Sequence, residues 1–122
     1  LLLQMVEEHL TPRRIMTREA LRNAIAAGMA MGASTNSTLH IPAIAHEGGL
    51  NVTLEDFDEI SRKVPYICNI KPSGQHPLVD LEEAGGIPAV VKAIEVQTGY
   101  QRFDCDRKDS AGEPGRGKGA GK

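Results

Sequence analysis

The sequence is poor in aromatic residues, with no Trp, two Phe and two Tyr among its 122 residues. A hydrophobic share of 40% is still compatible with a packed core, which Ala, Ile, Leu, Val and Met would then have to build. The length corresponds to one domain, since domains typically hold about 100–200 residues. The composition therefore predicts a single small unit with an aliphatic core.

Cysteine is also scarce, and Cys68 and Cys105 fit neither a metal-binding spacing nor a disulfide framework. We interpret them as free thiols in a reducing cytoplasm. No apolar run approaches the roughly 20 residues that a membrane span needs. A signal peptide would have basic residues before its apolar run, and the opening LLL run has none. The net charge of −2 gives no indication of nucleic-acid binding. We expect a cytoplasmic protein without membrane or nucleic-acid partners.

Helix start and stop signals predict a helical structure for most of the chain. Apolar residues recur at helical spacing over residues 1–10, and Thr11-Pro12 ends that helix because proline disfavours helix in the preceding residue. Thr17 can cap a helix that runs to about Met31. After the polar residues 32–36, a second apolar helix ends at glycines 48 and 49. Further helices are expected over residues 53–60, 78–84 and 87–96. The first of these begins with a capping-box pattern formed by Thr53 and Asp56.

Residues 64–70 are the best strand candidate, because they are apolar and β-branched, and Pro72-Ser73-Gly74 would turn the chain after them. A strand among helices indicates the α/β fold class. One strand cannot form a sheet, so we expect a partial, helix-rich layer of an α/β domain whose other strands lie outside this chain. The chain also begins without Met and within a helical pattern, which indicates a piece of a longer protein. Residues 101–122 are rich in glycine and charge, and this composition predicts a disordered tail.

The polar residues Ser34, Thr35 and Asn36 lie between two apolar helices, where small polar side chains are least expected by chance. They can cap the following helix, or the free amides at its start can hold a carboxylate or phosphate. A non-catalytic anion-binding or interaction module is one hypothesis built on this start. His40 and His46 are six residues apart and point in different directions, which disfavours a zinc site. Residues 71–74 (KPSG) and 85–88 (GGIP) are either ordinary turns or places of close ligand approach.

Together these segments resemble a known family. Residues 31–45 (MGASTNSTLHIPAIA) resemble the GGSTN-x-x-LH-x-x-AIA segment of the dihydroxy-acid dehydratase and phosphogluconate dehydratase family. The strings DFDEIS (56–61), VPYIC (64–68), KPSG (71–74) and AGGIPAV (84–90) follow in the family's order and spacing. Ala33 replaces the family's second glycine. The resemblance covers residues 1–100, as part of the family's N-terminal α/β domain, and residues 64–74 are most similar to the branched-chain dihydroxy-acid dehydratases.

The resemblance implies a hydro-lyase that dehydrates 2,3-dihydroxy acids to 2-keto acids in branched-chain amino-acid biosynthesis, with sugar-acid dehydratases such as phosphogluconate dehydratase as the alternative. It implies an iron–sulfur cluster (2Fe-2S or 4Fe-4S) acting as a Lewis acid on the departing hydroxyl. It also implies a Mg²⁺ ion on the substrate, a serine base, a small-molecule dihydroxy acid as substrate and a homodimer. The family's cluster cysteines, metal-binding acids and serine base do not map onto residues 1–100. We therefore assign no catalytic and no metal-binding residue, expect the fragment to be inactive alone, and expect Ser34, Thr35 and Asn36 only to bind substrate or support the site.

The family continues after this region with TGKT-x-x-ENL, which this chain lacks. With suitable codons, shifting residues 106–109 by one base gives TGKT, and shifting residues 111–115 gives LENL. We therefore put forward the hypothesis that residues 101–122 are an out-of-frame translation. The rival interpretation is a genuine basic tail, whose local charge of +2 would attract anions only weakly.

Overall fold

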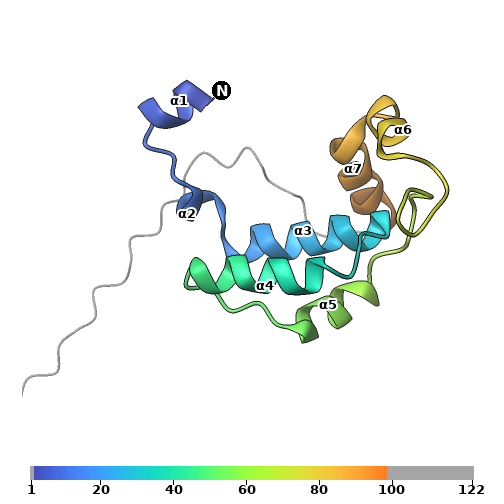
Figure 1. Ribbon diagram of the computed structural model, residues 1–122, viewed down its shortest axis with the longest axis horizontal. Coiled ribbons are helices and arrows are strands. Elements are labelled where there is room, and N and C mark those ends of the chain that lie inside the picture. Colours follow the sequence, from blue (N-terminus) through green and yellow to red (C-terminus); the bar gives the residue numbers. More distant parts are fainter. Residues whose placement is uncertain (1, 99–122) are drawn as a thin grey trace, which may run out of the picture.

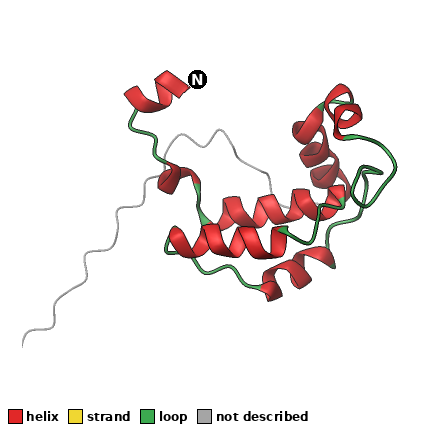
Figure 2. Ribbon diagram, in the orientation of Figure 1, coloured by secondary structure: helices red, strands yellow, loops and turns green. Residues whose placement is uncertain are grey.

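The computed structural model describes residues 2–98, and within them the chain is built from helices (Figures 1 and 2). The helices of this range are α1 (Leu2–Glu7), α2 (Pro12–Ile15), α3 (Arg18–Met31), α4 (Ser37–Glu47), α5 (Leu54–Ser61), α6 (Leu78–Glu83) and α7 (Gly86–Thr98). None of them is both long and apolar enough to cross a membrane. The predicted helices are confirmed to within a few residues at each end, whereas residues 2–98 form no sheet and do not show the expected α/β layer.

The strand predicted over residues 64–70 is wrong. This segment is an irregular stretch whose Ile67 and Cys68 amides both donate to the Ala30 carbonyl near the end of α3, at 2.9 and 3.1 Å. Its ladder pairing is limited to one isolated bridge between Ile70 and His76. The apolar, β-branched composition reflects burial instead, since Val64 and Ile70 are both buried. The segment covers one end of α3 rather than entering a sheet among residues 2–98.

Helix α3 is the central element, and α4, α5 and α7 all pack on it. It begins as predicted, because the Thr17 hydroxyl accepts a hydrogen bond from the Ala20 amide at 3.1 Å. Figure 1 shows α3 and α4 running side by side, with α5 beneath them and the α6–α7 hairpin rising from the C-terminal end of α3. The core consists of aliphatic side chains with one aromatic, Phe57, and its fully buried large members are Ile25, Ile60 and Ile94.

An ionic network joins α3 to α5. Asp56 is buried, and its carboxylate accepts hydrogen bonds from Arg18 (2.9 Å) and Arg22, two α3 residues one turn apart. The same carboxylate accepts from the Thr53 amide at 3.1 Å, which is the Asp56 half of the predicted capping box. Arg22 also contacts the Glu59 carboxylate at 3.1 Å. Because both arginines point at α5, the network fixes the α5 position along α3.

The two ends of the described range differ in how they pack. Helices α6 and α7 form a hairpin that is held to the core by Leu81, Val90 and Ile94. Helices α1 and α2 contribute no buried residue, and the exposed fractions of Leu2 and Leu3 are 73% and 80%. The expected boundary at residue 100 and the expected disordered tail over residues 101–122 lie outside the described residues.

Candidate functional site

The loop between α3 and α4 begins with a Schellman motif. Gly32 has φ 68° and ψ 45°, a left-handed conformation, and its amide donates to the Met29 carbonyl at 3.2 Å. The Ala33 amide donates to the Gly28 carbonyl at 2.9 Å, which completes the motif. A side chain at position 32 would collide with the Tyr66 ring, 2.5 Å from an added Cβ. This position therefore requires glycine for both its conformation and its surroundings.

Ser34, Thr35 and Asn36 follow this turn, and all three are exposed. The Ser34 hydroxyl accepts a hydrogen bond from the Asn36 amide at 3.3 Å. Asn36 precedes α4, yet its side chain makes no capping hydrogen bond with the helix. Capping therefore does not account for the Asn36 side chain, which is exposed and carries both donor and acceptor atoms.

The amides at the start of α4 donate to nearby backbone carbonyls. The Ser37, Thr38 and Leu39 amides pair with the carbonyls three residues earlier, each at 3.0 Å, so the loop enters the helix through a tight turn. An anion at this helix start would compete with those bonds. The polar side chains of the loop, rather than the amides of α4, are therefore the groups that this loop offers to a ligand.

The structure brings the KPSG turn against this loop. The Ser73 hydroxyl donates to the Gly32 carbonyl at 2.6 Å, across 41 residues of sequence. The turn itself is closed by its own backbone, since the Lys71 amide donates to the His76 carbonyl at 2.8 Å and the Gly74 amide to the Ile70 carbonyl at 2.6 Å. Two segments that the sequence analysis selected separately thus form one surface at the C-terminal end of α3. This contact could not be predicted, because neither turn pattern specifies a partner.

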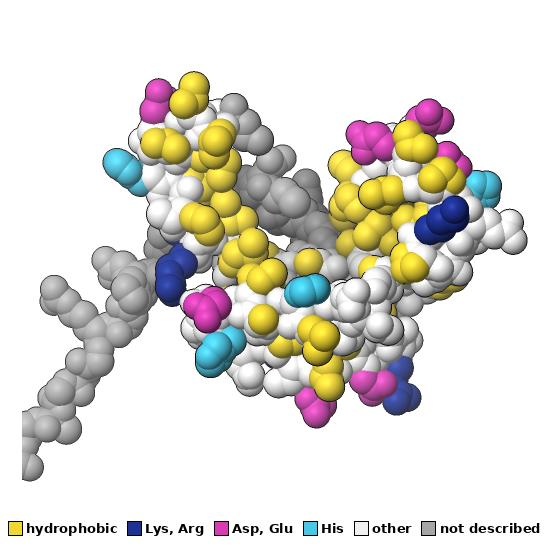
Figure 3. Space-filling view, in the orientation of Figure 1, with side chains coloured by type: hydrophobic (Ala, Val, Ile, Leu, Met, Phe, Trp, Pro, Cys, Tyr) yellow, Lys and Arg dark blue, Asp and Glu magenta, His cyan; other side chains and the backbone are white. Residues whose placement is uncertain are grey.

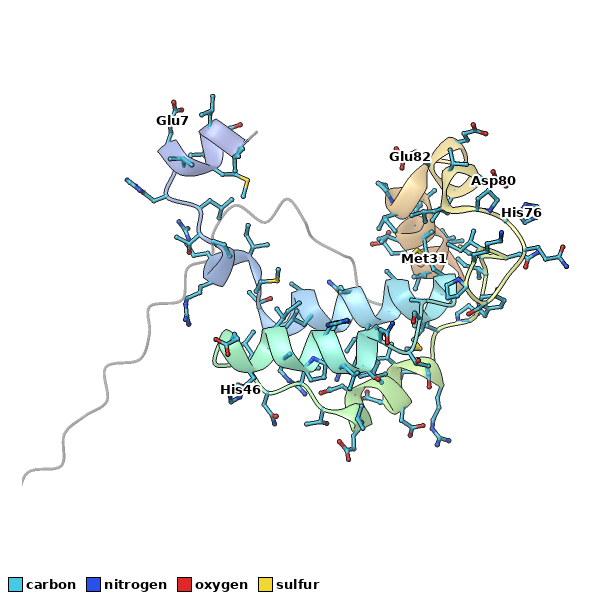
Figure 4. All side chains as sticks on the ribbon, in the orientation of Figure 1. Glu7, Met31, His46, His76, Asp80 and Glu82 are labelled. Atoms are coloured by element: carbon cyan, nitrogen blue, oxygen red, sulfur yellow. The ribbon has the colours of Figure 1, made fainter. Side chains whose placement is uncertain are left out.

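Glycines 85 and 86 join α6 to α7, and packing explains them. Both have positive φ, and Gly86 is buried with the Glu82 carboxylate 3.2 Å from where its Cβ would lie. Figure 4 places Glu82 on the hairpin, with His76 and Asp80 at its outer edge and Met31 at the end of α3 beside it. His76 Nδ1 lies 3.0 Å from an Asp80 carboxylate oxygen, and both residues of this pair, four positions apart, are exposed.

The remaining candidate ligands stay apart. His40 and His46 are both exposed on α4, and no three His, Cys, Asp or Glu side chains within residues 2–98 gather into a metal-binding group. Cys68 is a free, half-buried thiol, and its burial raises the pKa of that thiol. Burial thus favours the protonated form, whereas metal binding and nucleophilic attack require the thiolate. Cys105 lies outside the described residues.

The ionic network around Asp56 was not predicted from the sequence. The signal was present, since Arg18 and Arg22 stand one turn apart on the helix and Asp56 lies in the first turn of another. Four-residue spacing of like charges indicates a shared partner on a facing element. The network positions α5 beneath α3, and it lies away from the surface formed by residues 32–36 and 71–74.

Comparison with known proteins agrees with the resemblance found in the sequence. The model of the dihydroxy-acid/6-phosphogluconate dehydratase N-terminal family matches residues 1–107. The dihydroxy-acid dehydratase of Ignicoccus hospitalis is 61% identical over 93 residues, which are 76% of this chain and 17% of that protein. The dihydroxy-acid dehydratase of Methanothermobacter thermautotrophicus is 54% identical over 105 residues, covering 85% of this chain and 19% of that protein. The chain thus spans less than a fifth of the length of these relatives, and it belongs to the dihydroxy-acid/6-phosphogluconate dehydratase family, in its N-terminal region.

Proposed function

We propose that this chain is part of a hydro-lyase that converts a 2,3-dihydroxy carboxylic acid to a 2-keto acid in branched-chain amino-acid biosynthesis. The observation that carries the proposal is the 54–61% identity to proteins named dihydroxy-acid dehydratase. The family description also includes 6-phosphogluconate dehydratase, so a sugar acid is the alternative substrate class. The names of the relatives favour a dihydroxy acid over 6-phosphogluconate.

Within that enzyme, we assign Ser34, Thr35 and Asn36 to binding the substrate or supporting the site. The Schellman turn holds one end of their loop, the first turn of α4 holds the other, and Ser73 fixes the Gly32 carbonyl between them. The loop is thus rigidly placed while its side chains stay exposed. Hydroxyl and amide groups in such a position can hydrogen-bond the hydroxyl and carboxylate groups of a dihydroxy acid.

The iron–sulfur cluster and Mg²⁺ implied by the family do not fit residues 2–98. This range contains no gathering of three metal-ligating side chains, and the pKa of its single cysteine is raised by burial. We therefore assign no catalytic and no metal-binding role to these residues. The ligands are proposed to come from the remainder of the longer protein. Purified chain that bound a cluster, detected by visible absorption, would contradict this assignment.

A chimeric enzyme tests the proposed function. The 93-residue segment of the Ignicoccus hospitalis relative is replaced by the matching segment of this chain, and 2-keto acid formation is measured. We expect turnover of a branched 2,3-dihydroxy acid at a rate comparable to that of the unmodified relative. Preference for 6-phosphogluconate would favour the sugar-acid alternative. A folded, cluster-loaded chimera that is inactive on both substrates would overturn the proposal.

Single substitutions in the chimera then test the loop. We expect Ser34→Ala and Asn36→Ala to reduce kcat/KM by about tenfold or more, since a hydrogen bond to a charged group contributes about 1.5–3 kcal/mol. Ser61→Ala is the matched control, because Ser61 is also exposed and its hydroxyl bonds only the nearby Asp58 carbonyl, at 2.9 Å. Equal changes in kcat/KM at positions 34, 36 and 61 would show that the loop is not part of the substrate site.

Other properties of the longer protein are proposed from the same family membership. We propose a cytoplasmic homodimer, which light scattering of the chimera would test against a monomer. A non-catalytic anion-binding module is less favoured, because the first amides of α4 already have backbone partners.

We also propose that residues 101–122 are an out-of-frame translation. If the codons of residues 106–115, shifted by one base, do not encode TGKT-x-x-ENL, that idea is wrong.

A further inference from the structure

The α6–α7 hairpin carries an exposed apolar face. Leu78, Val79 and Ile87 are 66%, 58% and 46% exposed, and they line a groove together with Leu81, Glu82 and Gly86. Figure 3 shows hydrophobic side chains gathered on the part of the molecule that α6 and α7 occupy in Figure 1. Glu82 is the single charged residue of the groove lining. An exposed apolar surface of this kind typically marks an interaction site.

The outer side of α5 has the opposite character. Asp58 pairs with Arg62 at 3.1 Å, and Glu59 pairs with Lys63 at 2.7 Å, all four being about half exposed or more. Ser61 stands among these charges and is exposed as well. Such charged side chains are stable in water and costly to bury. These charged pairs of α5 are therefore suited to water, whereas the α6–α7 groove is suited to contact with other polypeptide.

The occupant of the α6–α7 face follows from the length and composition of what lies outside residues 2–98. Residues 101–122 contain one Phe, one Cys and two Ala among glycines and charges, too little apolar surface to cover the face. The relatives, by contrast, are more than five times as long as the segment they share with this chain. Most of the polypeptide of these relatives thus lies outside the shared segment, and it is the source that we consider for a covering segment.

We propose that the α6–α7 face, defined by Leu78, Val79 and Ile87, is an internal interface covered by apolar segments of the longer dehydratase from outside residues 1–122. The proposal rests on the family membership but not on the proposed activity. It requires that Val79 is inaccessible in the longer protein and accessible in this chain alone. It also requires that the outer side of α5 stays accessible in both.

Cysteine labelling tests this difference with two matched substitutions. Val79→Cys and Ser61→Cys each place a thiol of similar size at an exposed helical position. The variants are made in this 122-residue chain and in the Ignicoccus hospitalis chimera, and both are treated with a maleimide. Peptide mass spectrometry then gives the labelling rate at each site separately from the native cysteines. Labelling needs no catalytic activity, so an inactive chimera does not affect the outcome.

We expect similar rates at both sites in the 122-residue chain, and in the chimera a rate at position 79 about tenfold or more below that at position 61, because labelling a covered thiol requires local opening. Equal rates in the chimera would overturn the proposal. Protection of position 79 in the 122-residue chain that rises with its concentration would assign the face to a second copy and also overturn it. If the chimera does not fold, the relative itself carries the two cysteines at the aligned positions, with the same expected difference.

Discussion

The Ser73 hydroxyl donates to the Gly32 carbonyl at 2.6 Å and thereby ties the KPSG turn to the end of α3. This bond joins residues 41 positions apart, so its loss frees the turn from the loop that carries Ser34, Thr35 and Asn36. We expect Ser73→Ala to lower the free energy of unfolding by about 1 kcal/mol, the usual contribution of one hydrogen bond. Urea denaturation of the two proteins measures the difference.

Ser61→Ala is the control for this prediction. Its hydroxyl also donates to a backbone carbonyl, that of Asp58 at 2.9 Å, but the two residues lie three positions apart on one helix. The helix keeps that carbonyl in place without the hydroxyl, so the substitution should change stability much less than Ser73→Ala. Equal losses at the two positions would show that Ser73 does not tie separate segments together.

Gly32 and Gly49 separate the cost of conformation from the cost of a collision. Both have left-handed φ angles, 68° and 72°, so alanine costs about 1–2 kcal/mol at each position from the backbone alone. An added Cβ at position 49 meets nothing within 4 Å, whereas at position 32 it would lie 2.5 Å from the Tyr66 ring. We expect Gly32→Ala to be more destabilising than Gly49→Ala by a further 1–3 kcal/mol or so, the usual range for overpacking. Thermal unfolding of both variants checks the ranking.

Asp56 is the shared acceptor for Arg18 and Arg22, and it is only 5% exposed. Asp56→Asn keeps the shape but removes the charge and replaces one acceptor oxygen by a donor. We expect a loss of about 2 kcal/mol, in the range for hydrogen bonds to charged groups. Asp58→Asn, which affects the exposed pair with Arg62, should have little effect because such pairs are screened by water. Equal losses of unfolding free energy at positions 56 and 58 would contradict the role of Asp56 as the shared acceptor for both arginines.

Glu59 makes stability depend on pH in a defined direction. Hydrogen bonds from Lys63 and Arg22 lower the pKa of its carboxyl below the ordinary 4.5. A lowered folded-state pKa contributes stability that is present above the ordinary value and is lost as the pH falls through the folded-state value. Glu59→Gln should therefore shrink the difference in unfolding free energy between neutral and acidic solution. Denaturation at several pH values measures it, and an unchanged pH profile would argue against the assignment.

Local sequence signals were sufficient to predict the helices, but they led to a wrong strand prediction over residues 64–70. Thr17, Gly32 and Gly48 mark helix ends through interactions within a few residues, so the sequence was sufficient to find α3 and α4. The apolar residues 64–70 indicate burial but not what buries them. Here α3 itself accepts their amides through the Ala30 carbonyl, and a sheet would have needed strands from elsewhere.

The candidate site was predictable in its parts but not in its assembly. The family motif selected Ser34, Thr35 and Asn36, and the turn pattern selected residues 71–74. Their contact through Ser73 and Gly32 depends on a long-range arrangement of α3 and the segment after α5. The lack of a capping hydrogen bond from Asn36 was equally unpredictable, since its position before a helix predicts a capping side chain.

Helices α1 and α2 bury no side chain, and this determines how the described residues exchange backbone hydrogens with solvent. A helix of six residues is unstable in water without tertiary contacts, because nucleation is unfavourable. Amides of residues 2–15 are therefore expected to exchange through local opening at small free-energy cost, while those around Ile25, Ile60 and Ile94 exchange only when the whole core unfolds. We therefore expect residues 18–98 to unfold as one cooperative unit from which residues 2–15 open separately, so that cleavage after Leu10 leaves that unit intact.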